Sequence, residues 1–242
     1  MDRLGYTAMT AASRTMMSLQ VRSNNLANVN TPGFRADLER AQAVAVEGYG
    51  YDSRHMAVVD NNGVSLAAGP MIATGRDLDF AVKGTGLIVL QDGEGEAYTR
   101  QGSMQVDAEG RLTLSGRAVM GEGGPIELPE HERVEIGNDG TVSIMAPGDW
   151  MMAEVDRIRL VDVPAADLMK NEAGLLVTRN GEPAAPSEDV RLASGFLESS
   201  NVSAIDELAS TMSLNRLFET QVKMMKAAED LSDAGNRMIR GS

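Results

Sequence analysis

Apolar and small residues recur with helical spacing at the start of the chain. Seven positions follow one another at alternating intervals of four and three residues: Gly5, Met9, Ala12, Met16, Leu19, Ser23 and Leu26. This is the spacing of a coiled-coil seam, and the small members of the set would let a second helix approach closely. The pattern predicts a helix from residue 1 to about residue 30. Its end is expected within residues 28–33, because Pro32 disfavours an α conformation at Thr31.

A second helical pattern occupies about residues 199–239. Its apolar positions fall in two frames that meet near Met212, which indicates a stutter in the repeat. The first frame is Ile205, Leu208 and Met212, and the second is Leu214, Leu217, Gln221, Met224, Ala228, Leu231, Gly235 and Met238. Ser199, Ser200 and Asn201 carry side chains that favour the N-cap position. At ~1.5 Å per residue this helix would extend roughly 60 Å, which is long for a compact domain.

The middle of the chain, about residues 70–195, shows short apolar runs separated by turn signals. Dipeptides that end in glycine stand at residues 92–93, 109–110, 115–116, 139–140 and 180–181. Strands are expected at residues 86–90, 97–100, 103–106, 111–114, 117–120, 133–136, 141–144, 155–161 and 175–178. Because no helical pattern intervenes, these strands are expected to form a mainly antiparallel β domain.

Residues 36–70 are the least regular stretch. A short helix is expected around residues 36–43, followed by an extended linker. The predicted fold class is therefore α+β, with long N- and C-terminal helices paired as a coiled-coil-like bundle beside a central β domain. The predicted divisions are 1–35 for the N-terminal helix, 36–70 for the linker, 71–196 for the β domain and 197–242 for the C-terminal helix.

The two helical ends are incomplete by themselves. Isolated helices with an apolar seam are marginally stable until they pack. These ends can bury their seams only against each other or against copies of the same chain. Because the helices are too long for the β domain to cover, the pattern favours burial between chains in a self-assembling structural protein. Leu217 and Phe218 are adjacent, so they cannot both face one seam, and one of them should contact a neighbouring subunit.

Composition and charge narrow the range of partners. The net charge is −13, and the acidity lies in the middle of the chain, because residues 1–35 are net basic. An acidic surface disfavours both nucleic acid and an anionic membrane surface. The chain has no cysteine, which excludes a disulfide framework. The sequence predicts no secretory signal peptide and no apolar run of the ~20 residues that would span a bilayer.

Few residues suit catalysis or metal binding. His55 and His131 are the only histidines, both in loop-like stretches, and a zinc site needs more ligands of that kind. Gly84 and Gly86 lack the third glycine of a dinucleotide fingerprint. The carboxylates within residues 77–79 and 92–96 lack the spacing of a calcium loop. The sequence therefore predicts no catalytic residue, no cofactor and no metal site.

Two segments near the ends of the chain carry distinctive motifs: residues 24–35 (NNLANVNTPGFR), and residues 195–202 (GFLESSNV) with 216–221 (RLFETQ). The first resembles the N-terminal signature, and the second the C-terminal signature, of the family of flagellar basal-body rod and hook proteins. Residues 78–86 (LDFAVKGTG), 98–103 (YTRQGS) and 106–112 (VDAEGRL) look like motifs of its β domain. The opening, residues 6–13 (YTAMTAAS), looks most like the proximal-rod class. One departure is Leu87-Ile88, where the family often has an aromatic pair, and we interpret it as repacking of a core strand.

The resemblance implies a non-catalytic structural subunit of the proximal rod. It implies a helical tube in the periplasmic part of the basal body, with the terminal helices inside, that transmits torque and surrounds the export channel. It also implies passage through the flagellar type III export apparatus without a cleaved signal peptide. Expected partners are copies of the chain, other proximal and distal rod proteins, the export apparatus and the surrounding periplasmic ring. Neither nucleic acid nor direct membrane insertion is expected.

The seams and signatures together supply candidate assembly residues. They are Met9, Met16, Leu19, Asn24, Asn25, Leu26, Asn28, Pro32, Gly33, Phe34, Leu197, Asn201, Val202, Leu217, Phe218, Val222 and Met225. Residues 28–34 are assigned to turning the chain out of the inner helix layer, although by themselves they are explained by a helix stop. Asn24 and Asn25 either fix the register by hydrogen bonding across helices or lie exposed near the helix end. The alternatives are a distal-rod or hook subunit of the same family, and a β-domain hydrolase with helical arms for oligomerisation.

Overall fold

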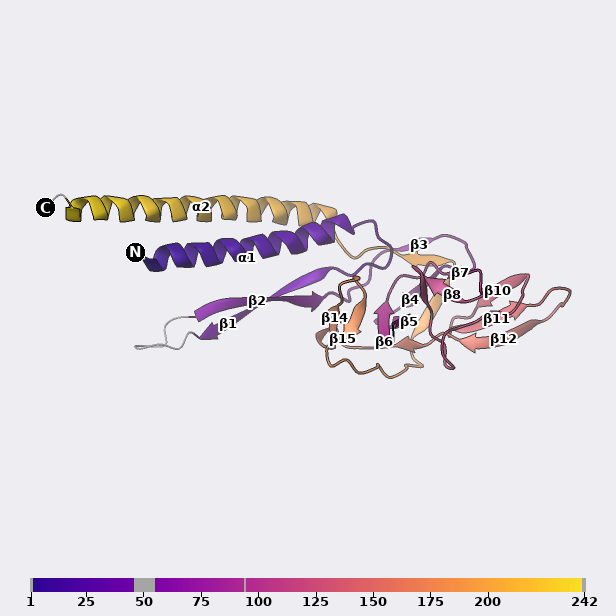
Figure 1. Ribbon diagram of the computed structural model, residues 1–242. Helices are drawn as coiled ribbons and strands as arrows, with labels where there is room; N and C mark the ends of the chain where they lie inside the picture. The colour runs from indigo at the N-terminus through magenta and orange to yellow at the C-terminus, as the bar shows by residue number, and fades with distance from the viewer. Residues whose placement is uncertain (1, 46–54, 94, 241–242) are drawn as a thin grey trace. The chain divides into compact units, whose positions relative to one another are not determined.

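The computed structural model describes residues 2–45, 55–93 and 95–240 (Figure 1). The chain divides into two compact units. Unit 1 comprises Met1–Ala27, Glu39–Asn61 and Ser203–Ser242, and unit 2 comprises Asn28–Leu38 and Asn62–Val202. Both terminal helices therefore belong to the same unit, as is expected if the two ends of the chain pair.

Unit 1 contains two long helices and most of a two-stranded sheet. Helix α1 spans Asp2–Ala27 and helix α2 spans Ala204–Arg240. Strands β1 (Asp37–Ala45) and β2 (His55–Val64) pair with each other. The helix expected around residues 36–43 was wrong. Helix-favouring residues there are overridden by pairing with the next strand of the chain, β2.

Unit 2 consists of short strands and one turn of 3-10 helix. The strands are β3 (Met71–Ala73), β4 (Phe80–Lys83), β5 (Leu87–Asp92), β6 (Gly95–Thr99), β7 (Gln105–Val106), β8 (Leu112–Leu114), β9 (Arg117–Ala118), β10 (Arg133–Ile136), β11 (Thr141–Met145), β12 (Met152–Arg157), β13 (Leu160–Val161), β14 (Leu168–Lys170), β15 (Leu176–Thr178), β16 (Arg191–Ser194) and β17 (Phe196–Glu198). The 3-10 turn is η1 (Ala165–Asp167). All nine expected strand positions carry strand, although several boundaries differ by a few residues.

The strands of unit 2 form small antiparallel sheets. The largest has the order β13-β5-β6-β15-β14, and three-stranded sheets are formed by β10-β11-β12 and β7-β8-β9. Strand β16 pairs with β4 and β17 pairs with β3, each in antiparallel register. Ser115 and Gly116 both have positive φ and join β8 to β9 as a two-residue hairpin turn. The antiparallel β region predicted from the sequence is therefore confirmed.

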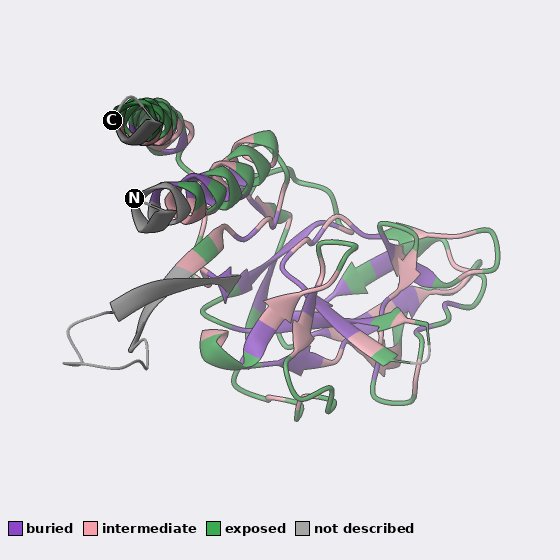
Figure 2. Cartoon of the chain, turned by 60° about the vertical axis from the view of Figure 1, so that its left-hand side comes forward, coloured by how far each residue is buried: buried purple, intermediate pink, exposed green. Residues whose placement is uncertain are grey.

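The core of unit 2 lies on both faces of β5. Leu87 and Val89 belong to one apolar cluster, and Ile88 and Leu90 belong to another. All four side chains are fully buried. Figure 2 shows buried residues concentrated in the strands of this unit, whereas much of α2 is exposed. The Leu87-Ile88 pair therefore occupies a core strand, as expected from its position.

Candidate assembly site

Helices α1 and α2 pack antiparallel within unit 1 (Figure 1). Small side chains of α1, among them Ala8, Ala12 and Thr15, are buried. The Thr15 hydroxyl donates a hydrogen bond of 3.0 Å to the side-chain oxygen of Gln221 on α2. Small residues at a helix contact allow the two backbones to approach closely, so this face joins the two ends of the chain.

The packed face of α2 repeats at alternating intervals of four and three residues. Every member of this set is buried or half-buried: Glu207, Thr211, Leu214, Phe218, Gln221, Met225, Ala228, Ser232 and Gly235. The spacing keeps one face of the helix toward its neighbour over most of its length. Both polar and apolar side chains contribute to this face.

A buried carboxylate ties the start of α2 to the end of α1. Glu207 is 6% exposed, and its carboxylate lies 3.2 Å from Nη1 of Arg22. Nδ2 of Asn25, which is 1% exposed, donates a hydrogen bond of 3.1 Å to Glu207 Oε1. A buried carboxylate that lost these donors would pay its full desolvation cost, so the network favours one register of the two helices.

A second face of α2 carries apolar side chains without burying them. Leu217, Met224, Leu231 and Met238 recur every seven residues and are 48%, 47%, 61% and 74% exposed. We call these four residues the outer stripe. They flank the packed face, and a row of exposed apolar side chains along a helix is typical of a protein contact.

The seam predicted from the sequence overlaps these two faces without matching either. On α1, Met9 and Met16 are exposed, and the buried positions are Ala8 and Thr15 one residue earlier. On α2, half of the second predicted frame lies on the packed face and the other half is the outer stripe, whereas Ile205, Leu208 and Met212 of the first frame are exposed and belong to neither. On α1, the predicted seam was therefore wrong by about one residue relative to the face that is buried. Small side chains occupy the close contact and displace the bulky methionines to its flank.

The start of α2 also differs from the prediction. Ser203 occupies the N-cap, and its hydroxyl accepts a hydrogen bond of 3.4 Å from the backbone N–H of Asp206. The expected cap residues 199–201 lie before the helix and belong to unit 2. Asp206 and Glu207 lie in the first turn, where the helix dipole favours acidic side chains.

Unit 2 brings the two family-like signatures together. The backbone N–H of Gly33 donates a hydrogen bond of 2.7 Å to the carbonyl oxygen of Glu198. The side-chain oxygen of Asn201 accepts a bond of 2.8 Å from Ala36 N–H, and its Nδ2 donates to the carbonyl oxygens of Ser65 and Ala67. We call this contact region the junction. It fixes the segment that follows α1 against the segment that precedes α2.

Two arginines share one carboxylate inside the junction. Arg35 Nη2 lies 2.6 Å and Arg100 Nη1 lies 3.2 Å from Glu198 Oε2, and all three side chains are at most 2% exposed. The other Glu198 oxygen accepts a hydrogen bond of 2.8 Å from the Gly69 N–H. Burial lowers the pKa of Arg100 to about 10, although Glu198 opposes this shift. The group remains charged at neutral pH, so the junction encloses one excess positive charge.

A lysine closes the side of the junction. Lys170 Nζ lies 2.6 Å from the Asp37 carboxylate and 3.8 Å from the centre of the Phe34 ring. It also donates a hydrogen bond of 2.7 Å to the carbonyl oxygen of Arg35. Burial lowers the pKa of Lys170, while Asp37 acts in the opposite direction. These contacts hold the chain after the Pro32–Gly33 turn against strand β14.

Substitution of Gly33 tests the junction. Gly33 has a φ of +71°, and an added Cβ would lie 2.3 Å from the backbone nitrogen of Gln101. Gly33→Ala is therefore expected to lower the free energy of unfolding by more than the ~1–2 kcal/mol that left-handed geometry costs. The matched control is Gly116→Ala, because Gly116 has a φ of +79° and no atom near the new Cβ. Urea denaturation compares the variants, and equal losses would contradict a close contact at Gly33.

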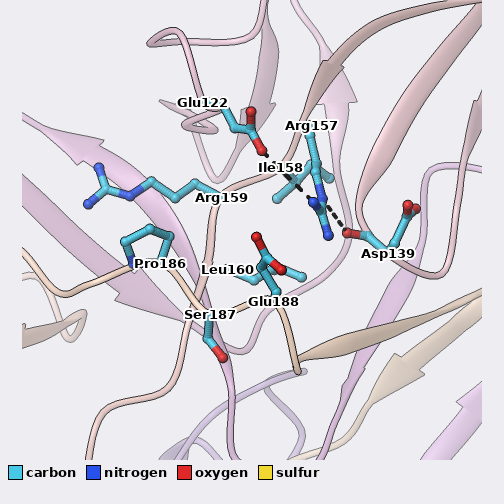
Figure 3. Close-up of a pocket in the computed structure, with 9 residues that line it drawn as sticks. All are labelled: Glu122, Asp139, Arg157, Ile158, Arg159, Leu160, Pro186, Ser187 and Glu188. Atoms are coloured by element: carbon cyan, nitrogen blue, oxygen red, sulfur yellow. Dashed lines mark hydrogen bonds and ion pairs between the residues drawn. The ribbon is translucent and has the colours of Figure 1, made fainter.

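A surface hollow of about 410 Å³ lies in unit 2 (Figure 3). Arg157 Nε donates a hydrogen bond of 3.0 Å to the Asp139 carbonyl oxygen, and its Nη1 lies 4.0 Å from the Glu122 carboxylate. Ser187 is the only hydroxyl among the nine lining residues, and none of the nine is histidine. No hydrogen bond joins the Ser187 hydroxyl to a lining carboxylate, so these nine residues show no nucleophile paired with a base.

The described part of the chain offers neither a metal site nor a membrane-spanning helix. Residues 2–45, 55–93 and 95–240 contain no group of three His, Cys, Asp or Glu side chains that could hold a metal ion. No helix within these ranges is long and apolar enough to cross a membrane. The expectation that both histidines lie in loops was wrong for His55, which begins β2.

The candidate residues fall into two groups, one in each unit. In unit 1, Met9, Met16, Asn24, Leu217 and Val222 are exposed, Leu19, Leu26, Phe218 and Met225 are half-buried, and Asn25 is buried. In unit 2, Gly33 is buried, and Asn28, Pro32, Phe34, Leu197, Asn201 and Val202 are half-buried. The first group lies on the helix pair, and the second group lies in or beside the junction.

The candidate residues predicted from the sequence did not include the charged residues that hold each of these two groups together. Arg35, Arg100 and Glu198 lie within quoted motifs, but their mutual contact joins residues 65 or more positions apart. Glu207 was not among the candidate residues, although it bonds to Asn25 of α1. The sequence contains one signal for the buried cluster: Glu198 is a charged residue within a run that otherwise resembles a strand.

Comparison with known proteins places these features in one family. Residues 6–35 match the model described as flagella basal body rod protein. Residues 81–144 match the flagellar hook protein FlgE/F/G D1 domain, and residues 193–238 match the C-terminal model of flagellar basal body rod FlgEFG proteins. The three matches cover α1 with the turn after it, much of the β region, and α2 with the strands before it.

Individual relatives match over the whole length. The chain is 37% identical to the flagellar basal-body rod protein FlgF of Escherichia coli K12 over 99% of both chains. It is 36% identical to the Salmonella typhimurium protein of the same name over 99% of both chains. The Caulobacter vibrioides protein of that name is 30% identical over 96% of both chains.

Proposed function

The chain belongs to the FlgF class of flagellar basal-body rod proteins, and from this premise we propose how it builds the proximal part of the rod. It is a structural subunit of the flagellar rod and not an enzyme, as the family of its full-length relatives establishes. A β-domain hydrolase with helical arms is disfavoured by the same matches. A distal-rod role within the family is disfavoured because the full-length relatives at 36% and 37% identity carry the FlgF name.

The outer stripe of α2 is the observation that supports assembly through the helices. One face of α2 is already covered by α1, yet Leu217, Leu231 and Met238 stay exposed. Contact with neighbouring subunits would bury this row at roughly 25 cal/mol per Å² of apolar surface. Met9 and Met16 of α1 are also exposed and would offer further apolar surface for contacts between subunits.

The helix pairs would stack around a common axis as a coiled-coil-like inner layer. A contact that repeats without closing generates a helical polymer, and a tube of this kind transmits torque as a shaft. The tube would surround the export channel, and the β region would lie outside. The divisions expected from the sequence, with the helices as an inner domain and residues 71–196 as an outer domain, fit this arrangement.

The proposed partners are copies of the chain and other proximal and distal rod proteins. The chain would reach the periplasm through the flagellar type III export apparatus without a cleaved signal peptide. The ring that surrounds the rod is a further proposed neighbour. The acidic net charge of −13 argues against nucleic acid as a partner.

Localisation in purified basal bodies tests the proposal. The full chain, expressed at native level in a strain that lacks its own FlgF-class subunit, should restore swimming and co-purify with basal bodies. Decoration with an antibody should place it on the rod at the end nearer the inner membrane. Decoration at the distal end would favour the distal-rod alternative, and absence from basal bodies would reject a rod function.

A further inference from the structure

An apolar loop projects from the three-stranded sheet of unit 2. Strands β10 and β11 alternate buried and outward residues, and Val134, Ile136, Val142 and Ile144 join the core. The loop between β11 and β12 turns tightly at Gly148, where the N–H of Asp149 donates to the Ala146 carbonyl oxygen at 3.0 Å. Figure 1 shows these three strands together at one end of unit 2, away from β14 and β15.

The loop exposes the largest apolar side chain of the protein. Trp150, the only tryptophan in the chain, is 95% exposed, and Met151 is 77% exposed. Met152, at the start of β12, is also exposed. Exposed aromatic and methionine side chains in a row are typical of contact sites, where tryptophan contributes a large share of the binding energy. We call residues 150–152 the apolar tip.

The sheet that carries the apolar tip is strongly acidic. Residues 127–156 contain eight acidic residues and one basic residue, Arg133, so they carry −7 of the total charge of −13. Seven of the eight acidic residues are exposed: Glu127, Glu130, Glu132, Glu135, Asp139, Asp149 and Glu154. Within this fully described segment no acidic side chain forms a salt bridge. Exposed carboxylates around an apolar centre favour a cationic rim on the partner.

The same region of a second copy does not supply that rim. The rest of the chain is itself net acidic: the total charge is −13, residues 127–156 carry −7, and the remaining residues therefore carry −6. Two copies that met at the apolar tip would bring acidic surfaces together, and like-charge contact is unfavourable. The same carboxylates would repel nucleic acid and an anionic membrane.

We propose that the apolar tip and the surrounding carboxylates form a docking surface for a different protein, one with an apolar recess bordered by lysine and arginine. Trp150 would enter the recess, and the carboxylates would face the cationic border. Tryptophan and methionine would supply most of the binding energy, while the charges would set the orientation and the rate of encounter. This contact is separate from the helix contacts that build the polymer.

Photo-cross-linking tests the docking surface in cells. Trp150→benzoylphenylalanine is introduced into the full chain in the complemented strain, with Ala173→benzoylphenylalanine as the control at an exposed turn of the same unit. The position-150 variant is expected to cross-link to a protein other than this chain. Mass spectrometry should place the link among apolar residues that are flanked by lysine and arginine.

A charge series tests the kind of partner. Glu132→Gln, Glu135→Gln and Glu154→Gln, combined, are expected to lower the cross-link yield about tenfold, because they remove the complementary charge. The control combination Glu172→Gln, Glu182→Gln and Glu188→Gln changes the net charge equally at exposed positions elsewhere in unit 2 and should leave the yield within about twofold.

The other outcomes would overturn the docking surface. Cross-links to this chain only would make the tip a contact between copies. A yield no higher than that of the Ala173 control would make it an unoccupied loop. If a different protein is cross-linked but the cross-link yield does not change in the charge series, the cationic border is rejected. Because the amount of chain in basal bodies is measured in parallel, failure of this proposal and failure of the rod function are distinguished.

Discussion

A chain that carries Leu217→Glu together with Leu231→Glu is expected to stay folded and to fail to enter the rod. Both positions lie on the outer stripe and are exposed in the single chain. Burial of one leucine contributes about 1.5–3 kcal/mol, and the loss is repeated at every subunit of a polymer. The substitution also forces two unpaired carboxylates into an apolar contact, which adds a desolvation cost. Swimming motility and the amount of chain in purified basal bodies measure the effect, and both should fall to background.

The control variant makes the same change in net charge on the polar face of α2. Asn215→Glu with Lys226→Gln alters two exposed side chains that lie away from the outer stripe. This variant is expected to swim like the unmodified chain. Normal incorporation of the stripe variant would contradict assembly through this face, and loss of incorporation in both variants would point to net charge instead.

The stability of the single chain separates failed assembly from failed folding. Substitution of exposed helix residues usually changes the free energy of unfolding by no more than about 0.5 kcal/mol. Both double variants should therefore keep the far-UV circular dichroism and thermal midpoint of the unmodified chain. A large drop in the midpoint of the stripe variant would show that Leu217 or Leu231 supports the fold of the monomer.

The existence of both terminal helices was predictable, but the orientation of their faces was not. The alternating spacing predicts a helix with an apolar seam, whichever face the partner covers. Which face is covered depends on how closely the partner approaches, and here small residues such as Ala8 and Ala12 lie in the contact. Methionine was assigned to the seam because it is apolar. Its exposure on α1 depends on the packing of α2, which is more than 170 residues away in the sequence.

The β region shows a similar division. Strands flanked by glycine turns were predicted because both strand and turn chemistry are local. Strands β3 and β4 pair with β17 and β16, whose residues lie more than 100 positions later, so no hairpin signal marks them. The junction is built from these same late pairings. Its residues were recognised through family resemblance, and the shared carboxylate of Glu198 became visible only in the structure.

Glu198→Gln is expected to produce the largest loss of stability among single substitutions in unit 2. The change preserves the shape of the side chain but leaves the charges of Arg35 and Arg100 buried without a counter-ion. Removing one partner from a buried charge pair costs about 3–5 kcal/mol. Calorimetry of the full chain measures the thermal midpoint, with Glu172→Gln, an exposed glutamate in the same unit, as the control. The control should leave the midpoint unchanged.

Arg35→Met determines whether charge balance or packing accounts for this loss. Nε and Nη1 of Arg35 have no hydrogen-bond partner among the described residues, whereas Arg100 Nη1 donates to the Val82 carbonyl oxygen at 3.0 Å. Removing Arg35 therefore leaves a balanced pair of Glu198 and Arg100, and most backbone contacts of the junction remain. If charge balance dominates, Arg35→Met lowers the midpoint less than Glu198→Gln does, although it deletes more hydrogen-bonding groups. If packing dominates, the order reverses, because glutamine is nearly isosteric with glutamate and methionine does not fill the space of arginine.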